Sequence, residues 1–308
     1  MRLSFASAPA TDSSTAKEAA QGAFQAPNDV RVAMVVEQMW QPVPGGSGTY
    51  ITNLAHSLRA QGVKVAGIAA RRSHNDPDSS AVGLETMPVR YANLPRPALY
   101  ESWNRLHSPL AEAILPASDL VHATTWAIPP TRKPLVVTVH DLAFLRNPEH
   151  FTKRGNSYFR KSLQRTIKEA QAVIVPSQAT ADDCYEAGID SELVHVIPHG
   201  VSVQEVSASQ IDLFRTAYGL SRPYVLWTGT REPRKNLPGL LHAFSRIAGE
   251  FPQLDLVLVG PSGWGDDAVE RQLIQAIGTS RVHVLGHLAQ DTLQQAYAGA
   301  RAFVFPSY

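Results

Sequence analysis

The sequence predicts an α/β protein with two doubly wound parallel sheets. Apolar runs of strand length alternate with longer stretches of helical periodicity along most of the 308 residues, and parallel sheets covered by helices produce this alternation. The rhythm is interrupted once, between residues 198 and 223, and then repeats. With 44% hydrophobic and 18% charged residues, the chain has a globular composition and is long enough for two cores.

The first half of the chain contains six strand-like runs, at 30–36, 63–69, 120–123, 135–139, 172–175 and 194–197. Helical patterns separate them at 50–58, 99–115 and 153–170, and after Ser177. The Pro-rich section from 71 to 97 carries few signals, and we expect only a short strand there, at 85–89. We therefore predict an amino-terminal domain over residues 29–200, preceded by a disordered tail at 1–28.

The second half repeats the pattern with strand-like runs at 224–228, 254–259, 282–285 and 302–305. Helical patterns lie between them at 237–249, 267–277 and 291–297. We predict a carboxyl-terminal domain over residues 224–308, joined to the first domain by a linker at 201–223. Because ligands bind at the carboxyl edges of parallel sheets, two such domains in series predict a ligand cleft between them.

The composition excludes several classes of protein. The 28 basic and 27 acidic residues give a net charge of +1, so we expect no nucleic-acid partner. Cys184 is the only cysteine, which excludes an intrachain disulfide and fits a cytoplasmic location. No apolar run approaches the roughly 18–20 residues that would span a bilayer. The first 28 residues contain no apolar segment of the secretory type.

A basic loop is the strongest candidate for a binding site. It follows a strand that ends near Gly229, and it carries Arg231, Arg234 and Lys235. Asn236 is expected to cap the helix that comes next. Three cations beside the positive end of a helix dipole suit a diphosphate group. The alternative is a solvated turn with ordinary surface charges.

A glycine turn and a histidine are the candidates on the other wall of the cleft. Gly45, Gly46 and Gly48 precede a helical pattern, where glycines allow the backbone to approach a phosphate or a sugar. The turn is not a dinucleotide fingerprint, because Ile51 occupies the place of the third glycine. His140 follows the strand at 135–139 and should emerge at the carboxyl edge of the sheet. A tight turn and a structural histidine are the alternatives.

Other motifs give weaker indications. Asp76-Pro77-Asp78 matches D-x-D but lies in a polar loop, so we interpret it as a turn. His195 and His199 straddle a strand end and lack the geometry of a metal-binding helix pair. The helix at 153–170 is rich in cations that could contact anionic lipid headgroups, or could form a solvated face. These cations are Lys153, Arg154, Arg160, Lys161, Arg165 and Lys168.

Eight segments, in the same order, resemble retaining glycosyltransferases of family 4. They are GGSGTY, VVTVHDLAFL, VIVPSQATADD, VHVIPHG, TGTREPRKNL, LVLVGPSGWG, VHVLGHL and ARAFVFPS. The resemblance covers about residues 30–308. It implies the GT-B architecture, in which two Rossmann-like domains face each other across a cleft. It also implies that a nucleotide-sugar donor is held mainly by the second domain and an acceptor by the first.

The resemblance also assigns roles to residues of the second domain. Lys235 matches the family's diphosphate-binding lysine. The family's partner arginine often follows the glycine that matches Gly229, but Thr230 stands there in this chain. The partner role therefore passes to Arg234, with Arg231 as a further candidate. Such cations replace a divalent metal at the leaving group, so we expect neither a metal nor another cofactor.

The same resemblance assigns roles to residues of the first domain. His140 matches a histidine that lies beside the donor sugar, and Gly46 and Gly48 match the glycine loop that approaches the donor. After the last strand, family members continue with an E-G-F-G-L-P segment, which opens a motif of two glutamates separated by seven residues. This chain ends at Tyr308 without that segment. We therefore expect a fragment or a truncated product, with an incomplete second domain.

The function implied is the transfer of a hexose from a GDP- or UDP-linked donor to a glycan or polyprenyl-linked acceptor, with retention. Overall similarity to bacterial polysaccharide and O-antigen mannosyltransferases suggests mannose, and suggests a role in cell-surface polysaccharide synthesis. Such an enzyme would work in the cytoplasm, with peripheral contact at the inner membrane surface. The alternatives are a GT-B nucleotide-sugar epimerase or phosphorylase, and a non-catalytic remnant or binding module.

Overall fold

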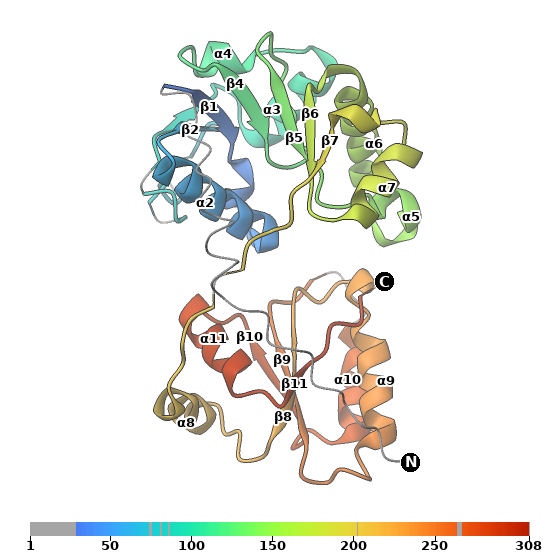
Figure 1. Ribbon diagram of the computed structural model, residues 1–308. Coiled ribbons are helices and arrows are strands. Elements are labelled where there is room, and N and C mark those ends of the chain that lie inside the picture. Colours follow the sequence, from blue (N-terminus) through green and yellow to red (C-terminus); the bar gives the residue numbers. More distant parts are fainter. Residues whose placement is uncertain are drawn as a thin grey trace.

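The computed structural model describes residues 29–73, 76–80, 82–85, 87–201, 203–263 and 267–307. These residues form two α/β lobes, one above the other, joined by an extended segment that follows the last strand of the first lobe (Figure 1). Each lobe contains one sheet in which every strand pairing is parallel. The predicted fold class is confirmed. The predicted tail at 1–28 lies outside the described residues.

The first lobe contains a seven-stranded sheet in the order β3-β2-β1-β4-β5-β6-β7. Its strands are β1 (Arg31–Val35), β2 (Lys64–Ala69), β3 (Val89–Tyr91), β4 (Leu120–Ala123), β5 (Leu135–Thr138), β6 (Ala172–Val175) and β7 (Val194–Val196). The chain builds outward from β1 to β3 and then returns to β4 on the other side of β1. The strand order therefore reverses between β1 and β4, where open α/β sheets form ligand crevices.

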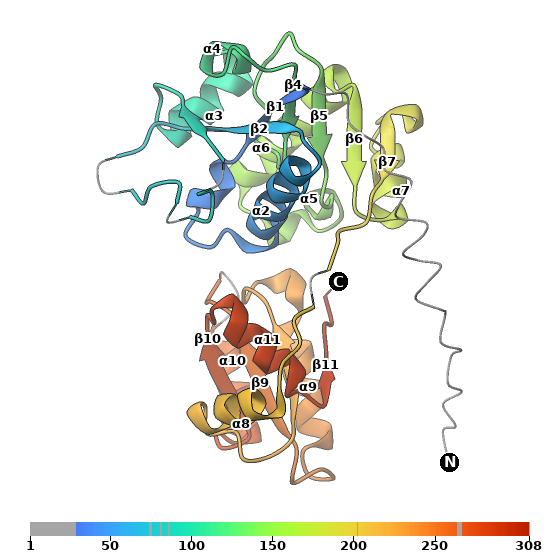
Figure 2. The same ribbon diagram turned by 60° about the vertical axis from the view of Figure 1, so that its left-hand side comes forward.

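Helices cover both faces of this sheet (Figure 2). They are η1 (Glu37–Trp40), α2 (Gly45–Ala60), α3 (Arg96–Arg105), α4 (Ala111–Ile114), α5 (Ala143–Arg146), η2 (Pro148–His150), α6 (Lys153–Glu169), α7 (Gln178–Glu186) and η3 (Ser191–Leu193). Ile51 and Ala55 of α2 pack with one set of strand residues, and Trp103 of α3 and Leu163 of α6 pack with another. The two separate cores explain why the buried strands read as continuous apolar runs.

Two element predictions for the first lobe were wrong in their bounds. The helix expected at 99–115 is two helices, because α3 ends at Arg105 and α4 starts at Ala111. Pro109 lies in the interruption, where it has no N–H to continue a helix, and its carbonyl accepts a hydrogen bond from Trp103 Nε1 at 3.1 Å. The strand expected at 85–89 is β3, which begins only at Val89.

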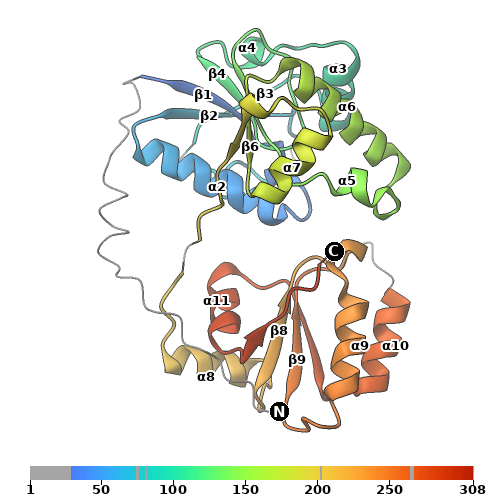
Figure 3. The same ribbon diagram turned by 45° about the vertical axis from the view of Figure 1, so that its right-hand side comes forward.

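The second lobe contains a four-stranded sheet in the order β10-β9-β8-β11. Its strands are β8 (Tyr224–Thr228), β9 (Asp255–Val259), β10 (Val282–Gly286) and β11 (Ala302–Phe303). Its helices are α8 (Ala208–Ala217), η4 (Pro233–Lys235), α9 (Leu237–Ile247), α10 (Asp267–Ile277) and α11 (Gln290–Ala298). Figure 3 shows α9 and α10 on one face of this sheet and α8 and α11 on the other. The second lobe is therefore also doubly wound.

Helix α8 lies within residues 201–223, the range expected to be a linker. Phe214 of α8 is 2% exposed and packs in one core with Tyr224 of β8 and Ala296 of α11. A capping box at Ser207 and Gln210 starts the helix. Much of the expected linker is thus a structural part of the second lobe, and the extended connection is shorter.

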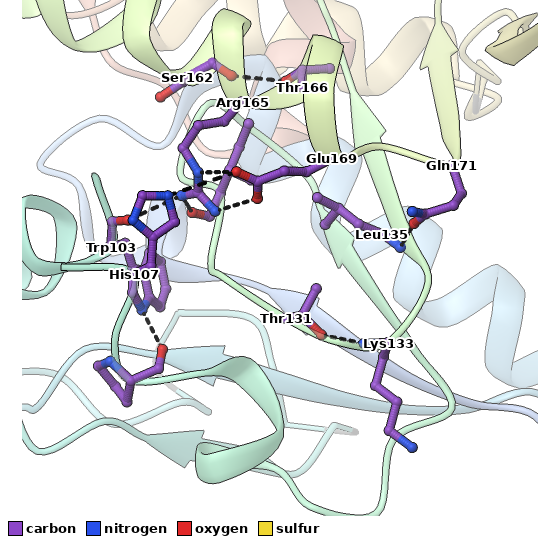
Figure 4. A network of polar contacts seen from close by, with 12 residues as sticks. Trp103, His107, Thr131, Lys133, Leu135, Ser162, Arg165, Thr166, Glu169 and Gln171 are labelled. Atoms are coloured by element: carbon purple, nitrogen blue, oxygen red, sulfur yellow. Dashed lines mark hydrogen bonds and ion pairs between the residues drawn. The ribbon is translucent and has the colours of Figure 1, made fainter. Parts of the chain in front are cut away.

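A buried arginine fixes α6 to its neighbours (Figure 4). Arg165 makes two contacts with the carboxylate of Glu169, at 3.0 and 2.8 Å. Its Nη1 also donates to the carbonyl oxygens of Ile128 at 2.5 Å and Trp103 at 3.3 Å. Arg165 therefore belongs to the interior, and it is wrong to count it among the exposed cations of this helix.

Candidate functional site

His140 lies at the carboxyl edge of the first sheet, as the sequence predicted. The buried strand β5 ends at Thr138, and the chain reaches His140 two residues later. The Nε2 atom of His140 lies 3.0 Å from the carbonyl oxygen of Thr124, which follows β4. A carbonyl oxygen can only accept, so His140 Nε2 carries the hydrogen. The Nδ1 atom of the neutral ring is then an acceptor.

Its surroundings favour the neutral form of His140. Burial lowers the pKa of this imidazole, and the positive charge of His199, when protonated, lowers it further. The hydrogen bond to Thr124 and the carboxylate of Asp141 act in the opposite direction but do not reverse the shift. At neutral pH, His140 is therefore an uncharged imidazole with a fixed tautomer.

Tyr50 and His199 enclose the ring of His140, and the sequence did not reveal this arrangement. The ring centroid of Tyr50 lies 5.0 Å from that of His140, edge to face, and 4.9 Å from that of His199. His199 Nε2 lies 3.4 Å from His140 Nδ1, on the acceptor side of that ring. His199 belongs to the exposed segment that leaves the first lobe after β7. The connection to the second lobe therefore begins against the candidate site.

A chain of buried polar groups holds Tyr50 from the other side. The Tyr50 hydroxyl lies 3.0 Å from Thr138 Oγ1, which in turn lies 2.8 Å from His122 Nε2. Burial lowers the pKa of His122 to about 4, so this ring is neutral at physiological pH. Burial also raises the pKa of Tyr50, which keeps its proton. These three side chains are thus uncharged at neutral pH, and their contacts fix the position of Tyr50 rather than transfer charge.

The glycine turn forms the first turn of α2, and its glycines serve different purposes. Gly45 has a φ of +62°, in the left-handed region that favours glycine. A Cβ at Gly48 would lie 2.5 Å from the Cβ of Pro44, so close packing requires glycine there. A Cβ at Gly46 would meet nothing within 4 Å. Gly46 therefore lies at an open helix N-terminus, where backbone N–H groups lack intrahelical acceptors.

Lys235 of η4 lies at the edge of the second lobe that faces the first. Burial lowers the pKa of this lysine, as does the neighbouring Arg234, whereas the carboxylates of Glu232 and Asp141 raise it. Asp141 belongs to the first lobe, so its effect places Lys235 within electrostatic reach of the opposite wall. The ammonium group also lies 4.3 Å from the ring centroid of Phe305.

Arg234 and His140 line one pocket, although they come from different lobes. The pocket has a volume of about 380 Å³ and is lined by both residues, together with Asp141 and Glu232. Arg234 forms an ion pair with Glu232 at 2.8 Å. Aromatic side chains complete the wall on the first lobe, namely Tyr100, Trp126, Phe144, Phe151, Tyr158 and Phe159. The structure thus brings His140 and Arg234, two predicted site residues that are 94 positions apart in the sequence, to one pocket.

Arg231 lies apart from this pocket. Its Nη1 lies 3.4 Å from Glu270 Oε2 of α10, and its Nη2 contacts the hydroxyl of Ser262. Its side chain is 19% exposed. Arg231 therefore serves contacts within the second lobe, and the geometry favours Arg234 over Arg231 as the partner of Lys235.

The expected cap at Asn236 was wrong in its chemistry. Asn236 precedes α9, but it has a φ of +52° and its side chain makes no capping hydrogen bond to the helix. Asparagine tolerates this left-handed conformation better than most residues. The side chain lies over Gly239, where a Cβ would be 2.5 Å from Asn236 Oδ1. Glycine at position 239 is what accommodates the turn.

The weaker motifs have ordinary surroundings. Asp76 Oδ2 accepts a hydrogen bond from the backbone N–H of Ser73 at 2.7 Å, as a turn residue does. Across the part of the chain that the structure describes, no group of three or more His, Cys, Asp or Glu residues could hold a metal ion. Among those same residues, no helix combines the length and apolar character needed to cross a membrane.

Comparison with known families identifies the chain. The model of Glycosyltransferase Family 4 matches residues 44–205, and that of Glycosyl transferases group 1 matches residues 222–308. The chain belongs to glycosyltransferase family 4. The first match contains β2 to β7 of the first sheet, and the second contains all four strands of the second sheet.

Two of the similar proteins are named as mannosyltransferases, as the sequence suggested. The chain is 27% identical to O-antigen chain mannosyltransferase B of Escherichia coli, over 69% of this chain and 58% of that protein. It is 31% identical to the E. coli serotype-specific mannosyltransferase WbdA, over 56% of this chain and 22% of that protein. The chain thus spans less than two thirds of either relative.

A solved structure supports the GT-B architecture. Anabaena Alr3699/HepE, determined with UDP and glucose, matches with a TM-score of 0.66 and 23% sequence identity. The match covers 90% of this chain and 74% of that one. At this identity the likeness establishes the fold alone.

Proposed function

We propose that this protein transfers a hexose from a nucleotide-sugar donor to a glycan acceptor. The observation that carries the proposal is the pocket shared by His140 of the first lobe and Arg234 of the second. Such a pocket can hold both substrates between the carboxyl edges of two parallel sheets. Membership of glycosyltransferase family 4 supports the same reaction class.

The donor diphosphate binds at Lys235 and Arg234 in this proposal. When the nucleoside diphosphate departs, negative charge grows on the leaving oxygen, and fixed cations stabilise that transition state more than the ground state. Charge-assisted hydrogen bonds of ~1.5–3 kcal/mol each can supply part of the ~8–23 kcal/mol that enzymes provide. These two cations then take the place of a divalent metal, and we propose that no metal is required.

His140 acts beside the donor sugar in this proposal. Its Nε2–H is committed to Thr124, so the ring presents a fixed and uncharged face to the pocket. A neutral ring there does not compete with Lys235 and Arg234 for the diphosphate. The resemblance to retaining enzymes supports retention at the anomeric carbon, which NMR of the product's anomeric proton would decide.

Mannose is the proposed sugar, because both E. coli relatives are named as mannosyltransferases. The donor nucleotide is either GDP or UDP. We further propose a glycan or polyprenyl-linked acceptor at the cytoplasmic membrane face, with the exposed Lys153, Arg160 and Lys168 of α6 in contact with anionic lipid. Sedimentation with phosphatidylglycerol vesicles, compared with phosphatidylcholine vesicles, tests that contact.

A donor screen tests the proposed function directly. The protein is incubated with GDP-mannose, UDP-glucose or UDP-GlcNAc, with and without polysaccharide acceptor fractions, and release of nucleoside diphosphate is measured. We expect release from one donor that depends on acceptor. Conversion of the sugar without any acceptor would indicate an epimerase, and no turnover with any donor would contradict the proposal.

A further inference from the structure

A second, basic pocket opens beside the candidate site, between α3 and α6. It has a volume of about 830 Å³. Gln41, Tyr100 and Tyr158 line both this pocket and the pocket beside His140, so the two hollows meet at these residues. The rings of Tyr100 and Tyr158 are stacked, with centroids 5.7 Å apart and planes 21° apart. The two pockets are therefore adjacent, and this aromatic pair forms part of the wall of each.

Unpaired cations characterise the basic pocket. Arg96, Arg105, Arg154 and Lys161 line it, and Glu101 is its one carboxylate. Glu101 forms an ion pair with Arg105. Within the described residues, none of the side chains of Arg96, Arg154 and Lys161 forms an ion pair or a hydrogen bond. Three positive charges thus remain unpaired around one hollow.

This concentration of charge is local and depends on two different helices. The whole chain has a net charge of only +1, so a general excess of basic residues does not explain it. Arg154 and Lys161 are seven residues apart on α6, which places them two turns apart on the same face. Arg96 begins α3 and approaches the pocket from the other side. The burial of Arg165 holds these two helices together.

We propose that the basic pocket binds a phosphate or diphosphate group carried by the acceptor, while the acceptor's sugar occupies the pocket beside His140. This inference rests on the proposed function and specifies its acceptor. Arginine and lysine are the residues that recognise phosphate oxygens. Three unpaired cations match the charge of a diphosphate better than that of a single sugar carboxylate. The aromatic wall between the pockets suits the apolar face of a sugar ring.

Binding of inorganic pyrophosphate tests the pocket without any sugar transfer. Titration calorimetry compares the wild type with the double variant Arg154→Gln/Lys161→Gln and with the single variant Lys235→Met. The matched control is Arg59→Gln/Lys133→Gln, which removes two exposed, unpaired cations from elsewhere on the first lobe. We expect the pocket variant to weaken binding at one site at least tenfold, and the control variant to weaken it less than twofold.

Two results of this titration would overturn the proposal. Equal loss in the pocket and control variants would mean that the general charge of the lobe attracts the anion. Loss in the Lys235→Met variant alone would mean that pyrophosphate binds only at the donor site. Melting curves accompany each titration, and because Arg154 and Lys161 are exposed, we expect unchanged midpoints.

Kinetics then connect the pocket with the acceptor. The glycan found in the donor screen is prepared as a free sugar and as a short-chain alkyl diphosphate ester. With the ester, we expect the pocket variant to raise the acceptor KM at least tenfold, with kcat and the donor KM nearly unchanged. With the free sugar, wild type and variant should be alike. If the variant is active and its KM for the ester is unchanged, the assignment of the acceptor diphosphate to this pocket is refuted, but the proposed function is not.

Changing the carrier of the diphosphate shows whether the pocket recognises an acceptor diphosphate or the phosphate groups of a membrane surface. The same diphosphate ester is offered in solution on a short chain, and on a polyprenyl chain in vesicles of phosphatidylcholine or of phosphatidylglycerol. An effect of the pocket variant that is of equal size in solution and in both kinds of vesicle supports recognition of the diphosphate itself, whichever molecule carries it. An effect confined to phosphatidylglycerol vesicles, with no effect on pyrophosphate or on the soluble ester, would assign the cations to a membrane surface and overturn the proposal.

Discussion

The charge of Lys235 is the feature of the candidate site that substitution can isolate most cleanly. It is the only lysine after residue 200. Its ammonium group also lies over the ring of Phe305, so a change to alanine would remove the charge and the side chain that reaches this ring together. Lys235→Met keeps a side chain of similar length over Phe305 and removes only the charge. Lys235→Arg keeps the charge and changes the shape.

The size of the effect follows from the surroundings of Lys235. The side chain is half-buried, and burial is the main reason that its pKa is lowered. A charge-assisted hydrogen bond in such a site contributes ~1.5–3 kcal/mol, which corresponds to roughly 10- to 150-fold in rate. Because the leaving oxygen gains charge in the transition state, most of this loss should fall on kcat rather than on KM.

The assay is steady-state release of nucleoside diphosphate by the three proteins over a range of pH. We expect Lys235→Met to lose about 100-fold in kcat, and Lys235→Arg to retain more activity than Lys235→Met. The lowered pKa also predicts that wild-type activity falls at alkaline pH, below the ordinary lysine pKa, as the charge is lost. Lys235→Arg should abolish that alkaline decline. A Lys235→Met variant with wild-type kcat would refute the assignment of the diphosphate to this residue.

Three further predictions concern the first lobe and the need for metal. The pKa of His122, lowered to about 4 from an unfolded value of 6.5, means that the unfolded chain binds more protons between these values. The contribution of His122 to the free energy of unfolding is therefore fully present above pH 6.5 and falls by roughly 3 kcal/mol toward pH 4. Urea unfolding of the wild type and of His122→Asn at pH 7 and pH 5 should show a smaller loss of stability in the variant. Tyr50→Phe removes the hydroxyl that contacts Thr138 while keeping the ring against His140. We expect the acid limb of the pH profile of kcat/KM to change little in Tyr50→Phe and to shift in Tyr50→Ala. Identical profiles in the two variants would contradict a positioning role of the Tyr50 ring. Treatment with EDTA should leave the rate of sugar transfer unchanged, and recovery of a lost rate by Mg²⁺ or Mn²⁺ would contradict the proposed metal independence.

Much of the fold could be predicted because its signals are local. The strands β1, β5 and β9 are buried over most of their length, so each appears in the sequence as a mainly apolar run. His140 could be placed at a sheet edge because it follows such a run within two residues. The same argument placed Lys235 and Arg234 beyond β8. One sheet edge and one basic loop were therefore enough to predict which walls face the cleft.

The remaining features of the site depend on distances that the sequence does not encode locally. Tyr50 and His199 are 149 positions apart, and their contact requires the start of α2 and the end of β7 to meet at the same sheet edge. Arg231 and Arg234 are three residues apart and look equivalent in the sequence. Only the position of Glu270 on α10 shows that Arg231 is held within the second lobe. Long-range packing, not residue type, separates these two arginines.

The course of the chain between the lobes gives His199 a position that no local pattern reveals. Val201 and Val203, just beyond it, are 87% and 82% exposed, so these two side chains pack against neither lobe. His199 itself contacts Tyr50 and His140, and the chain becomes buried again only in α8 of the second lobe. The extended connection is therefore fixed at one end by the candidate site and at the other by the core that contains Phe214. Because Arg234 belongs to the second lobe and His140 to the first, any rotation about this connection changes the distance between the two sides of the pocket.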